Sequence, residues 1–318
     1  MTAVAAPNVP HATEDSHPTA RSMTTQLRDI RKKLALRVLS PDDWAQWTTS
    51  GYVVVRNAVP QDKVQRLVEL LWRFDEKDPG DPSTWYAPQR REHKMREINN
   101  TGMLEIYNHQ CLWDTRQEPR VYDAFVDVWD REDLWVAIDR ANLNPPKKVQ
   151  GNPNGFIHWD ANTSLQPLPI GVQGVLSLRR QGGDIGGFQC VPGLFERFGE
   201  WLRAQPEDRD PWHPDVSGFE VINIDMEPGD LLIWNTLLAH GVRPNHSKDQ
   251  VRMAQYISMF PADFDDEAER AKRIESWRER KPPVRDAFPG DPREWERKNA
   301  TTAELTPLGE KLLGLKRW

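Results

Sequence analysis

The chain has 318 residues, and its 42 basic and 48 acidic side chains give a net charge of −6, which excludes a general attraction to nucleic-acid phosphates or anionic lipid. A mean hydropathy of −0.73 leaves no apolar run of about 18 residues that could span a bilayer. Two cysteines, Cys111 and Cys190, are too few for a disulfide framework or a thiolate zinc site, and no signal peptide is evident, so we expect a cytoplasmic protein.

The N-terminal third of the chain divides into a tail and a helical region. Residues 1–36 lack regular apolar spacing, so we expect a flexible tail in front of a single domain of residues 37–318. The next stretch shows apolar residues at helical spacing, interrupted by one run of β-branched residues. We predict helices from Ser40 to Gly51, over 61–75 and over 118–130, and a strand over Tyr52–Arg56.

From about residue 133 the sequence consists of short apolar runs separated by glycine and proline. This pattern is typical of a β-sandwich or jelly roll. The domain core therefore spans about 40–260, and 261–318 is a C-terminal helical extension that begins with a charged helix over 264–281. The predicted strands are Leu134–Asn142, Gly155–Asp160, Gly171–Arg179, Phe188–Val191, Phe219–Asp225, Asp230–Trp234, Leu237–Val242 and Arg252–Phe260.

Two His-x-Asp triplets occur, and their surroundings separate them. His158 and Asp160 lie in an apolar, glycine-bounded strand, where side chains at i and i+2 point to one face about 7 Å apart and can converge on one ion. His213 and Asp215 flank a proline in a proline- and aspartate-rich stretch, which cannot join a central strand. We interpret the second pair as part of a surface loop.

A third ligand is needed, and His240 is the candidate because it is the one imidazole in an apolar run that ends at Gly241. The alternative is a core histidine with satisfied hydrogen bonds. Two imidazoles and one carboxylate form the facial triad of non-haem Fe(II) oxygenases. An acidic co-substrate would need a buried cation, for which Arg252 and Arg243 compete.

Several segments of residues 40–260 together form a pattern: GYVVVRNAVP from Gly51, the triplet His158–Asp160, GGFQCVPG from Gly186, PGD from Pro228, His240-Gly241 and Arg252. In this order they resemble a known family, the phytanoyl-CoA dioxygenase-like Fe(II)/2-oxoglutarate oxygenases. Two features depart from the family pattern: Leu194-Phe195 stands where Ser-His is usual, and the spacing from His240 to Arg252 is one residue longer. The second departure keeps Arg243 as an alternative.

The resemblance implies a double-stranded β-helix, a cupin-like jelly roll, with N-terminal helices packed on the outer sheet. It implies Fe(II) held by His158, Asp160 and His240, with 2-oxoglutarate and O2 as co-substrates. Arg252 would then pair with the distal carboxylate of 2-oxoglutarate, and Gln173 would be a further co-substrate contact. The expected reaction is hydroxylation of a small-molecule substrate with release of succinate and CO2.

A polar and aromatic stretch precedes the strands, and in this kind of fold such stretches often cover the pocket. It yields four candidates for the substrate side of the site, for which structural hydrogen bonding is the alternative role: Asn100, Tyr107, His109 and Arg140. The 14 tryptophans are interpreted mainly as core residues.

Three other functions compete with the dioxygenase. A halogenase on the same scaffold would have a small residue at the carboxylate position, and Asp160 disfavours it. A β-sandwich that binds a ligand without catalysis would not need an intact set of ligands. A cupin-like zinc or manganese protein could use the same three ligands, but it would have no use for Arg252.

Overall fold

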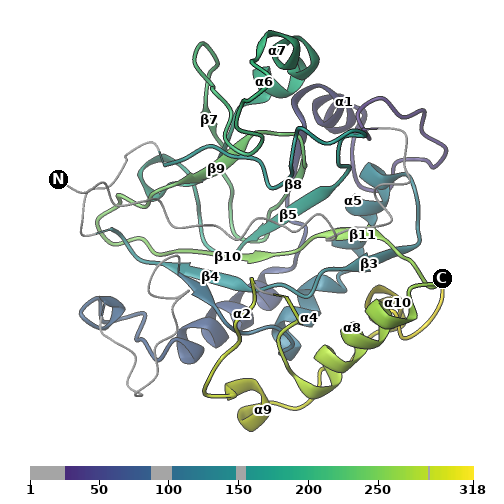
Figure 1. Cartoon of the computed structure of the whole chain (residues 1–318). Coiled ribbons are helices and arrows are strands. Elements are labelled where there is room, and N and C mark those ends of the chain that lie inside the picture. The colour runs from purple at the N-terminus through teal and green to yellow at the C-terminus, as the bar shows by residue number, and fades with distance from the viewer. Residues whose placement is uncertain (1–25, 87–101, 148–154, 286) are drawn as a thin grey trace.

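The computed structural model describes residues 26–86, 102–147, 155–285 and 287–318 (Figure 1). Antiparallel sheets with flanking helices are confirmed as the architecture. The largest sheet has the strand order β1-β8-β5-β10-β4-β2, a second has the order β7-β6-β9, and β11 pairs with β3. The strands are β1 (Tyr52–Val55), β2 (Met103–Leu104), β3 (Leu134–Val136), β4 (Ala141–Asn144), β5 (Val172–Ser177), β6 (Gly187–Cys190), β7 (Ile222–Asn223), β8 (Leu231–Asn235), β9 (His240–Arg243), β10 (Arg252–Tyr256) and β11 (Met259–Pro261).

Helices surround these sheets. The first helix follows its sequence signals closely: Ser40 caps it by accepting from the Asp43 N–H, and Gly51 ends it in the left-handed conformation at φ 78°. The helices are α1 (Pro41–Ser50), α2 (Gln61–Phe74), α4 (Gln110–Arg116), α5 (Pro119–Trp129), α6 (Pro192–Glu196), α7 (Phe198–Ala204), α8 (Glu267–Glu279), α9 (Trp295–Asn299) and α10 (Pro307–Leu313).

The six-stranded sheet separates two apolar clusters. Side chains from one of its faces, such as Leu231 and Met253, share a cluster with residues of α2, α4 and α5. Side chains from the other face, such as Leu232 and Ala254, share a second cluster with Phe188 of β6. Figure 1 shows the corresponding layers, with α2 and α4 below β4 and β10, and with β7 and β9 above them. We call the face that carries Leu232 and Ala254 the interior face.

Strand register decides which side chains share the interior face. Antiparallel Cα partners point their side chains to the same side of a sheet. Ala254 pairs with Ser177 and with Asn142, and Tyr256 pairs with Val175, so all of them point to the interior face. This face therefore carries polar groups as well as apolar ones.

The described part of the expected tail is packed against the domain. Leu27 is fully buried, and the Arg28 guanidinium donates to the Phe195 carbonyl. The backbone N–H groups of residues 33 and 34 donate to Asp130, and those of residues 37 to 39 donate to Asp127. We call residues 26–39 the N-terminal strap. The prediction of a flexible tail over residues 1–36 is wrong for residues 26–36, which are the part of that tail that the structure describes.

Two long predicted strands are each divided in the structure. The expected strand 134–142 appears as β3 and β4, and the expected strand 252–260 appears as β10 and β11. Both strands are interrupted at matching positions, because β3 pairs with β11 in one sheet while β4 pairs with β10 in another. Helix α6 begins at Pro192, because proline is suited to the first helical position.

None of the helices in the described parts of the chain has both the length and the apolarity that crossing a membrane requires.

Candidate active site

The structure brings His158, Asp160 and His240 together, with one potential ligand atom of each lying within 4.8 Å of the others. Asp160 Oδ1 lies 3.0 Å from His158 Nε2, and its Oδ2 lies 3.2 Å from His240 Nε2. One carboxylate therefore faces both imidazoles from the same side.

Backbone hydrogen bonds between two distant segments bring the histidines together. The His158 N–H donates to the His240 carbonyl at 2.8 Å, and the His240 N–H donates to the His158 carbonyl at 3.0 Å. The expected strand Gly155–Asp160 is reduced to this single antiparallel bridge. Gly241 permits it, since a Cβ there would lie 1.7 Å from the Phe156 carbonyl oxygen. The close approach of the two backbones thus requires glycine at position 241.

The spacing of these atoms fits a metal ion. Two ligands about 2.1 Å from an ion and at right angles to each other lie about 3.0 Å apart. The distance of 3.0 Å from Asp160 Oδ1 to His158 Nε2 equals this value, and the other oxygen, Oδ2, lies 3.2 Å from His240 Nε2. The Asp160 side chain is 27% exposed, whereas His240 is 6% exposed, so one side of the cluster is open. The donor set is compatible with iron and leaves room for further ligands.

The electrostatics of the cluster favour a cation. Burial alone would raise the pKa of Asp160, but hydrogen bonds and charge interactions with His158 and His240 hold that pKa well below its usual value. His240 Nδ1 lies 2.9 Å from the Leu238 carbonyl oxygen, to which it donates. This bond places a proton on Nδ1, so Nε2 is the nitrogen that can coordinate a metal ion once it gives up its own proton and its hydrogen bond to Asp160.

Aromatic rings enclose His240. The Phe188 ring stacks on the imidazole at 5.5 Å with an interplanar angle of 11°, and the Trp234 ring lies at 5.1 Å. Both belong to the cluster between the two sheets. They limit rotation of the imidazole and shield it from water on those sides.

Arg252 and Gln173 lie on the interior face of the six-stranded sheet. Arg252 is on the same strand face as Ala254, and Gln173 pairs with Trp234, which belongs to the interior cluster. The Arg252 residue is only 8% exposed. Burial lowers the pKa of Arg252, and the neighbouring Tyr256 counteracts this effect.

Arg243 points to the other side of its sheet. In the pairing of β6 with β9, Cys190 lies opposite His240, whereas Gly187 lies opposite Arg243. Alternation along β9 therefore separates the two side chains, and Arg243 Nε donates to Gln189 Oε1 at 3.4 Å. The structure brings Arg252, and not Arg243, to the interior face.

Two of the substrate-side candidates meet at a buried carboxylate. Arg140 Nη1 donates to Glu105 Oε1 at 2.7 Å, and the Tyr107 hydroxyl donates to the other oxygen of Glu105. The Gly290 N–H also donates to Glu105, at 3.0 Å. This network joins the C-terminal extension to Arg140, the residue before β4, which is a structural role. Asn100 lies outside the described residues.

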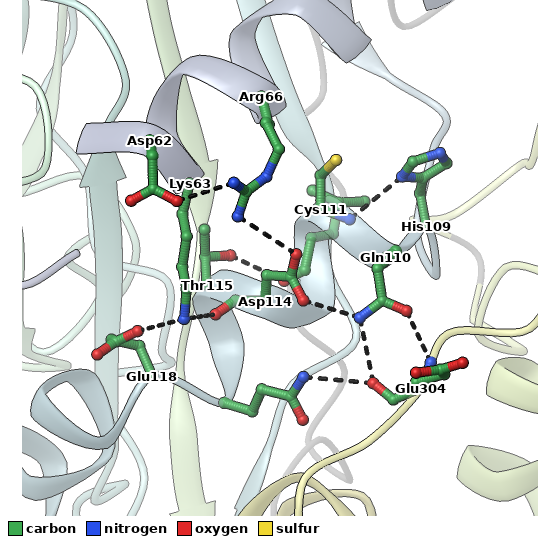
Figure 2. Close-up of polar contacts among 12 residues, drawn as sticks. Asp62, Lys63, Arg66, His109, Gln110, Cys111, Asp114, Thr115, Glu118 and Glu304 are labelled. Atoms are coloured by element: carbon green, nitrogen blue, oxygen red, sulfur yellow. Dashed lines mark hydrogen bonds and ion pairs between the residues drawn. The ribbon is translucent and has the colours of Figure 1, made fainter. Parts of the chain in front are cut away.

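His109 has a structural role in the helical layer (Figure 2). Its Nδ1 caps α4 by accepting from the Cys111 N–H at 3.2 Å. Its ring lies 6.3 Å from that of Trp295 in α9. Figure 2 also shows the neighbouring helix α2, in which Arg66 forms an ion pair with Asp62 at 2.8 Å. The structure does not bring His109 to the metal cluster.

The second His-x-Asp triplet lies in an exposed loop. The His213 ring is 57% exposed and pairs with Asp210 at 2.9 Å. Asp215 accepts from the Ser217 N–H instead. The pair does not contribute to the cluster formed by His158, Asp160 and His240.

Sequence reasoning missed Asn142 on β4. It is 2% exposed, and its Nδ2 donates to the Tyr256 hydroxyl oxygen at 3.0 Å. The sequence carries a weak signal, because Asn142 alternates with Arg140, but the pairing of Asn142 with Ala254 depends on a cross-strand register that the sequence does not reveal.

Comparison with known proteins gives one family, since residues 47–254 match phytanoyl-CoA dioxygenase. The chain is 28% identical over 255 residues to Ava biosynthesis cluster protein O of Aspergillus versicolor, covering 70% of this chain and 78% of that protein. The structure of GlcNAc-inducible gene 2 from Candida albicans aligns with a TM-score of 0.61 at 12% identity, covering 86% of this chain and 76% of that chain. The epimerase SnoN, in complex with Fe3+, alpha ketoglutarate and nogalamycin RO, aligns with a TM-score of 0.50 at 14% identity, covering 69% and 82%.

Proposed function

Because the chain belongs to the phytanoyl-CoA dioxygenase family, we propose that it hydroxylates a small molecule in an Fe(II)- and 2-oxoglutarate-dependent reaction that releases succinate and CO2. Family membership makes the protein a dioxygenase-type oxidoreductase, with iron and 2-oxoglutarate as cofactor and co-substrate. The observation that carries the proposal is the convergence of His158, Asp160 and His240 beside an open face.

The proposal includes the finer architecture of the fold. We assign residues 37–318 to one domain, with a core over 40–260 and an extension over 261–318. In this assignment the two facing sheets form a double-stranded β-helix, and the N-terminal helices pack on its outer sheet. The cluster that α2 and α5 share with β1 and β8 supports this arrangement.

The residues of the site have separate roles in this reaction. His158, Asp160 and His240 would hold the iron, which supplies the redox chemistry that activates dioxygen. Asp160 offsets part of the ion's charge, because its low pKa keeps it ionised. The Arg252 guanidinium would pair with the distal carboxylate of 2-oxoglutarate through its planar, bidentate donors. Phe188 and Trp234 exclude water from one side of His240.

The substrate is proposed to be a small molecule. The relative with 28% identity is named for a biosynthesis cluster, which supports a substrate from small-molecule biosynthesis. Hydroxylation is favoured over halogenation, because Asp160 holds the position that a halide would need.

The test is conversion of 2-oxoglutarate to succinate by the purified protein without added substrate. We expect succinate to form in the presence of Fe(II) and to disappear when a chelator is added. An Asp160→Ala variant should form none, because only two ligands remain, whereas Asp215→Ala should match the parent. A parent protein that binds both Fe(II) and 2-oxoglutarate by titration but forms no succinate would favour the alternative of a β-sandwich that binds a ligand without catalysis.

A further inference from the structure

We propose that Trp159 is a positioning residue for the proposed metal ligands, because it ties the segment that carries His158 and Asp160 to the turn that carries His240. This inference rests on the proposed function, since it assigns a further residue a role toward the same metal site. Trp159 lies between His158 and Asp160 in the sequence and is only 1% exposed.

The Trp159 side chain points away from the metal cluster. Residues on either side of Trp159 share one side of an extended backbone, and Trp159 itself takes the other side. Its ring contacts the rings of Phe198 and Trp201 in α7 edge to face, at centroid distances of 5.8 and 5.4 Å. Trp159 is therefore not a ligand itself, and any effect on a bound metal ion passes through its neighbours.

The indole N–H of Trp159 is bonded to the turn between β8 and β9. Trp159 Nε1 donates to the Leu237 carbonyl oxygen at 2.9 Å in a buried hydrogen bond. The carbonyl of the next residue, Leu238, accepts from His240 Nδ1 at 2.9 Å. Two successive carbonyls of one turn thus hold the Trp159 indole and the His240 imidazole. Movement of the indole would be passed to the imidazole through this turn.

The turn that offers these two carbonyls is itself fixed by Asn235. The Leu237 N–H donates to Asn235 Oδ1, and the Leu238 N–H donates to the Asn235 carbonyl, both at 2.9 Å. Asn235 is buried, and its Nδ2 donates to the Gln26 carbonyl of the N-terminal strap at 3.0 Å. These bonds leave the turn little freedom, so it can act as a rigid support for both rings.

Backbone hydrogen bonds fix the chain on both sides of Asp160. The Trp159 N–H donates to the Trp212 carbonyl at 2.8 Å, and the Thr163 N–H donates to the Pro211 carbonyl at 3.3 Å. The loop that contains Pro211 and Trp212 therefore holds the Asp160 segment from a second direction.

Asp160 needs this support because its own surroundings are open. Its side chain is 27% exposed, and its two carboxylate oxygens face His158 and His240. Groups that hold a metal ligand in place commonly change metal affinity by about tenfold to a hundredfold when they are replaced. We expect an effect of this size for Trp159.

The test measures metal affinity in the absence of substrate and 2-oxoglutarate. The Kd of Mn(II) is obtained from the electron paramagnetic resonance signal of free Mn(II). Trp159→Phe keeps an aromatic ring but removes the indole N–H, and it should raise this Kd by about tenfold to a hundredfold. The visible spectrum of the Co(II)-loaded variant should also differ from that of the parent, because it depends on the arrangement of the ligands. An unchanged Kd or an unchanged spectrum would overturn the inference.

Trp129→Phe provides the matched control. The Trp129 indole is 2% exposed and donates to the Met259 carbonyl at 2.8 Å, but it belongs to the other apolar cluster. Both variants lose a buried indole N–H, so both should unfold at lower urea concentration, whereas only Trp159→Phe should lose Mn(II) affinity. An equal loss of affinity in Trp129→Phe would show a general effect of destabilisation and overturn the positioning role.

Phe198→Leu is the second variant if Trp159→Phe does not fold. It keeps the indole N–H and removes a ring that contacts Trp159 edge to face. We expect the Mn(II) Kd to rise by about twofold to tenfold, which is the range that one aromatic pair contributes. An unchanged Kd in Phe198→Leu would then overturn the inference.

His240→Ala separates this inference from the proposed function. If the parent binds Mn(II), His240→Ala does not, and Trp159→Phe binds it as tightly as the parent, only the role of Trp159 is wrong. If the parent protein itself fails to bind Mn(II), the proposed function is wrong, and the inference fails with it.

Discussion

Arg243 and Arg252 carry the same charge, yet the fold directs them to different surroundings. Arg252 is buried on the interior face, whereas Arg243 contacts Gln189 on the opposite side of its own sheet. Sequence spacing alone leaves both as candidates, because the loop between β9 and β10 hides the register of the later strand. The difference becomes visible only when β10 is paired with β4 and β5.

Replacing each arginine should separate their roles. Arg252→Ala should weaken 2-oxoglutarate binding by roughly thirtyfold to several thousandfold, because losing the partner of a buried charge costs on the order of 2–5 kcal/mol. Arg243→Ala should change it by well under tenfold. The Kd of 2-oxoglutarate for the metal-loaded variants is the measurement, and iron affinity should stay near that of the parent in both. A large loss in Arg243→Ala alone would contradict the assignment.

The three residues proposed as metal ligands could be selected from the sequence because the signals for them are local. Alternation in an expected strand selected His158 and Asp160, although that strand is reduced to a single bridge, and apolar surroundings selected His240. The bond between Asn142 and Tyr256 was not within reach, since it joins residues on two strands whose register is a tertiary property. The role of His109 as a helix cap was missed because α4 itself is short and was not predicted.

Among the elements, the N-terminal strap shows how a segment without secondary structure becomes ordered. Sequence patterns predict helices and strands but not a segment whose backbone donors are satisfied by side chains of another element. Asp127 of α5 is fully buried and accepts from the N–H groups of Arg37, Val38 and Leu39 at 2.8 to 2.9 Å. One buried carboxylate thus replaces the hydrogen bonds that a sheet or helix would provide.

Replacing the Asp127 carboxylate, which accepts these three hydrogen bonds, should destabilise the protein. Asp127→Asn puts an amide N–H2 against backbone donors, so we expect the free energy of unfolding to fall by about 2–4 kcal/mol. Asp123→Asn is the matched control on the same helix, because its ion pair with Arg37 is about 30% exposed and should contribute less than about 1 kcal/mol. Urea unfolding of both variants is the measurement, and equal losses would show that the strap contributes little.

The C-terminal extension contains a carboxyl group with an altered titration. Burial raises the pKa of Glu296 to about 7, although the N–H groups of Tyr107 and Asn108 and the charge of Arg116 oppose this rise. The pKa of Glu296 is higher in the folded than in the unfolded state. Its stabilising contribution is therefore complete below about pH 4.5 and is lost as the pH rises through about 7.

A Glu296→Gln variant should remove this dependence. Relative to the variant, the parent should lose on the order of 2–3 kcal/mol of unfolding free energy between pH 5 and 8, since one pKa unit corresponds to about 1.4 kcal/mol. Glu294→Gln changes an exposed neighbour and should show the parent's pH profile. Urea unfolding at three pH values measures this, and a constant difference between parent and Glu296→Gln would disprove it.

For the whole molecule, the proposed metal site joins segments that are far apart in the chain. Asp160 and His240 are separated by 240 − 160 = 80 residues, so the complete ligand set exists only in the folded protein. An ion that binds only the folded state stabilises it, by about 2.7 kcal/mol at a hundredfold excess over its Kd. The Tm should rise by several degrees on adding Mn(II).

His240→Ala should abolish this rise in Tm, because two ligands remain. His213→Ala should keep it, since that ring lies in an exposed loop. Differential scanning calorimetry with and without metal gives both values. An unchanged response in His240→Ala would show that the metal binds elsewhere.

The paired backbone bonds between His158 and His240 also have a consequence for metal supply. They hold the ligands in place without an ion, so the protein does not need to fold around iron to form the site. A preformed site of two imidazoles and one carboxylate accepts several divalent ions, and its intrinsic preference follows the order in which Cu²⁺ and Zn²⁺ exceed Fe²⁺. The ion that occupies the site is then decided by the concentrations of the divalent ions around the protein. Exposure to zinc after purification would replace the iron without unfolding the enzyme.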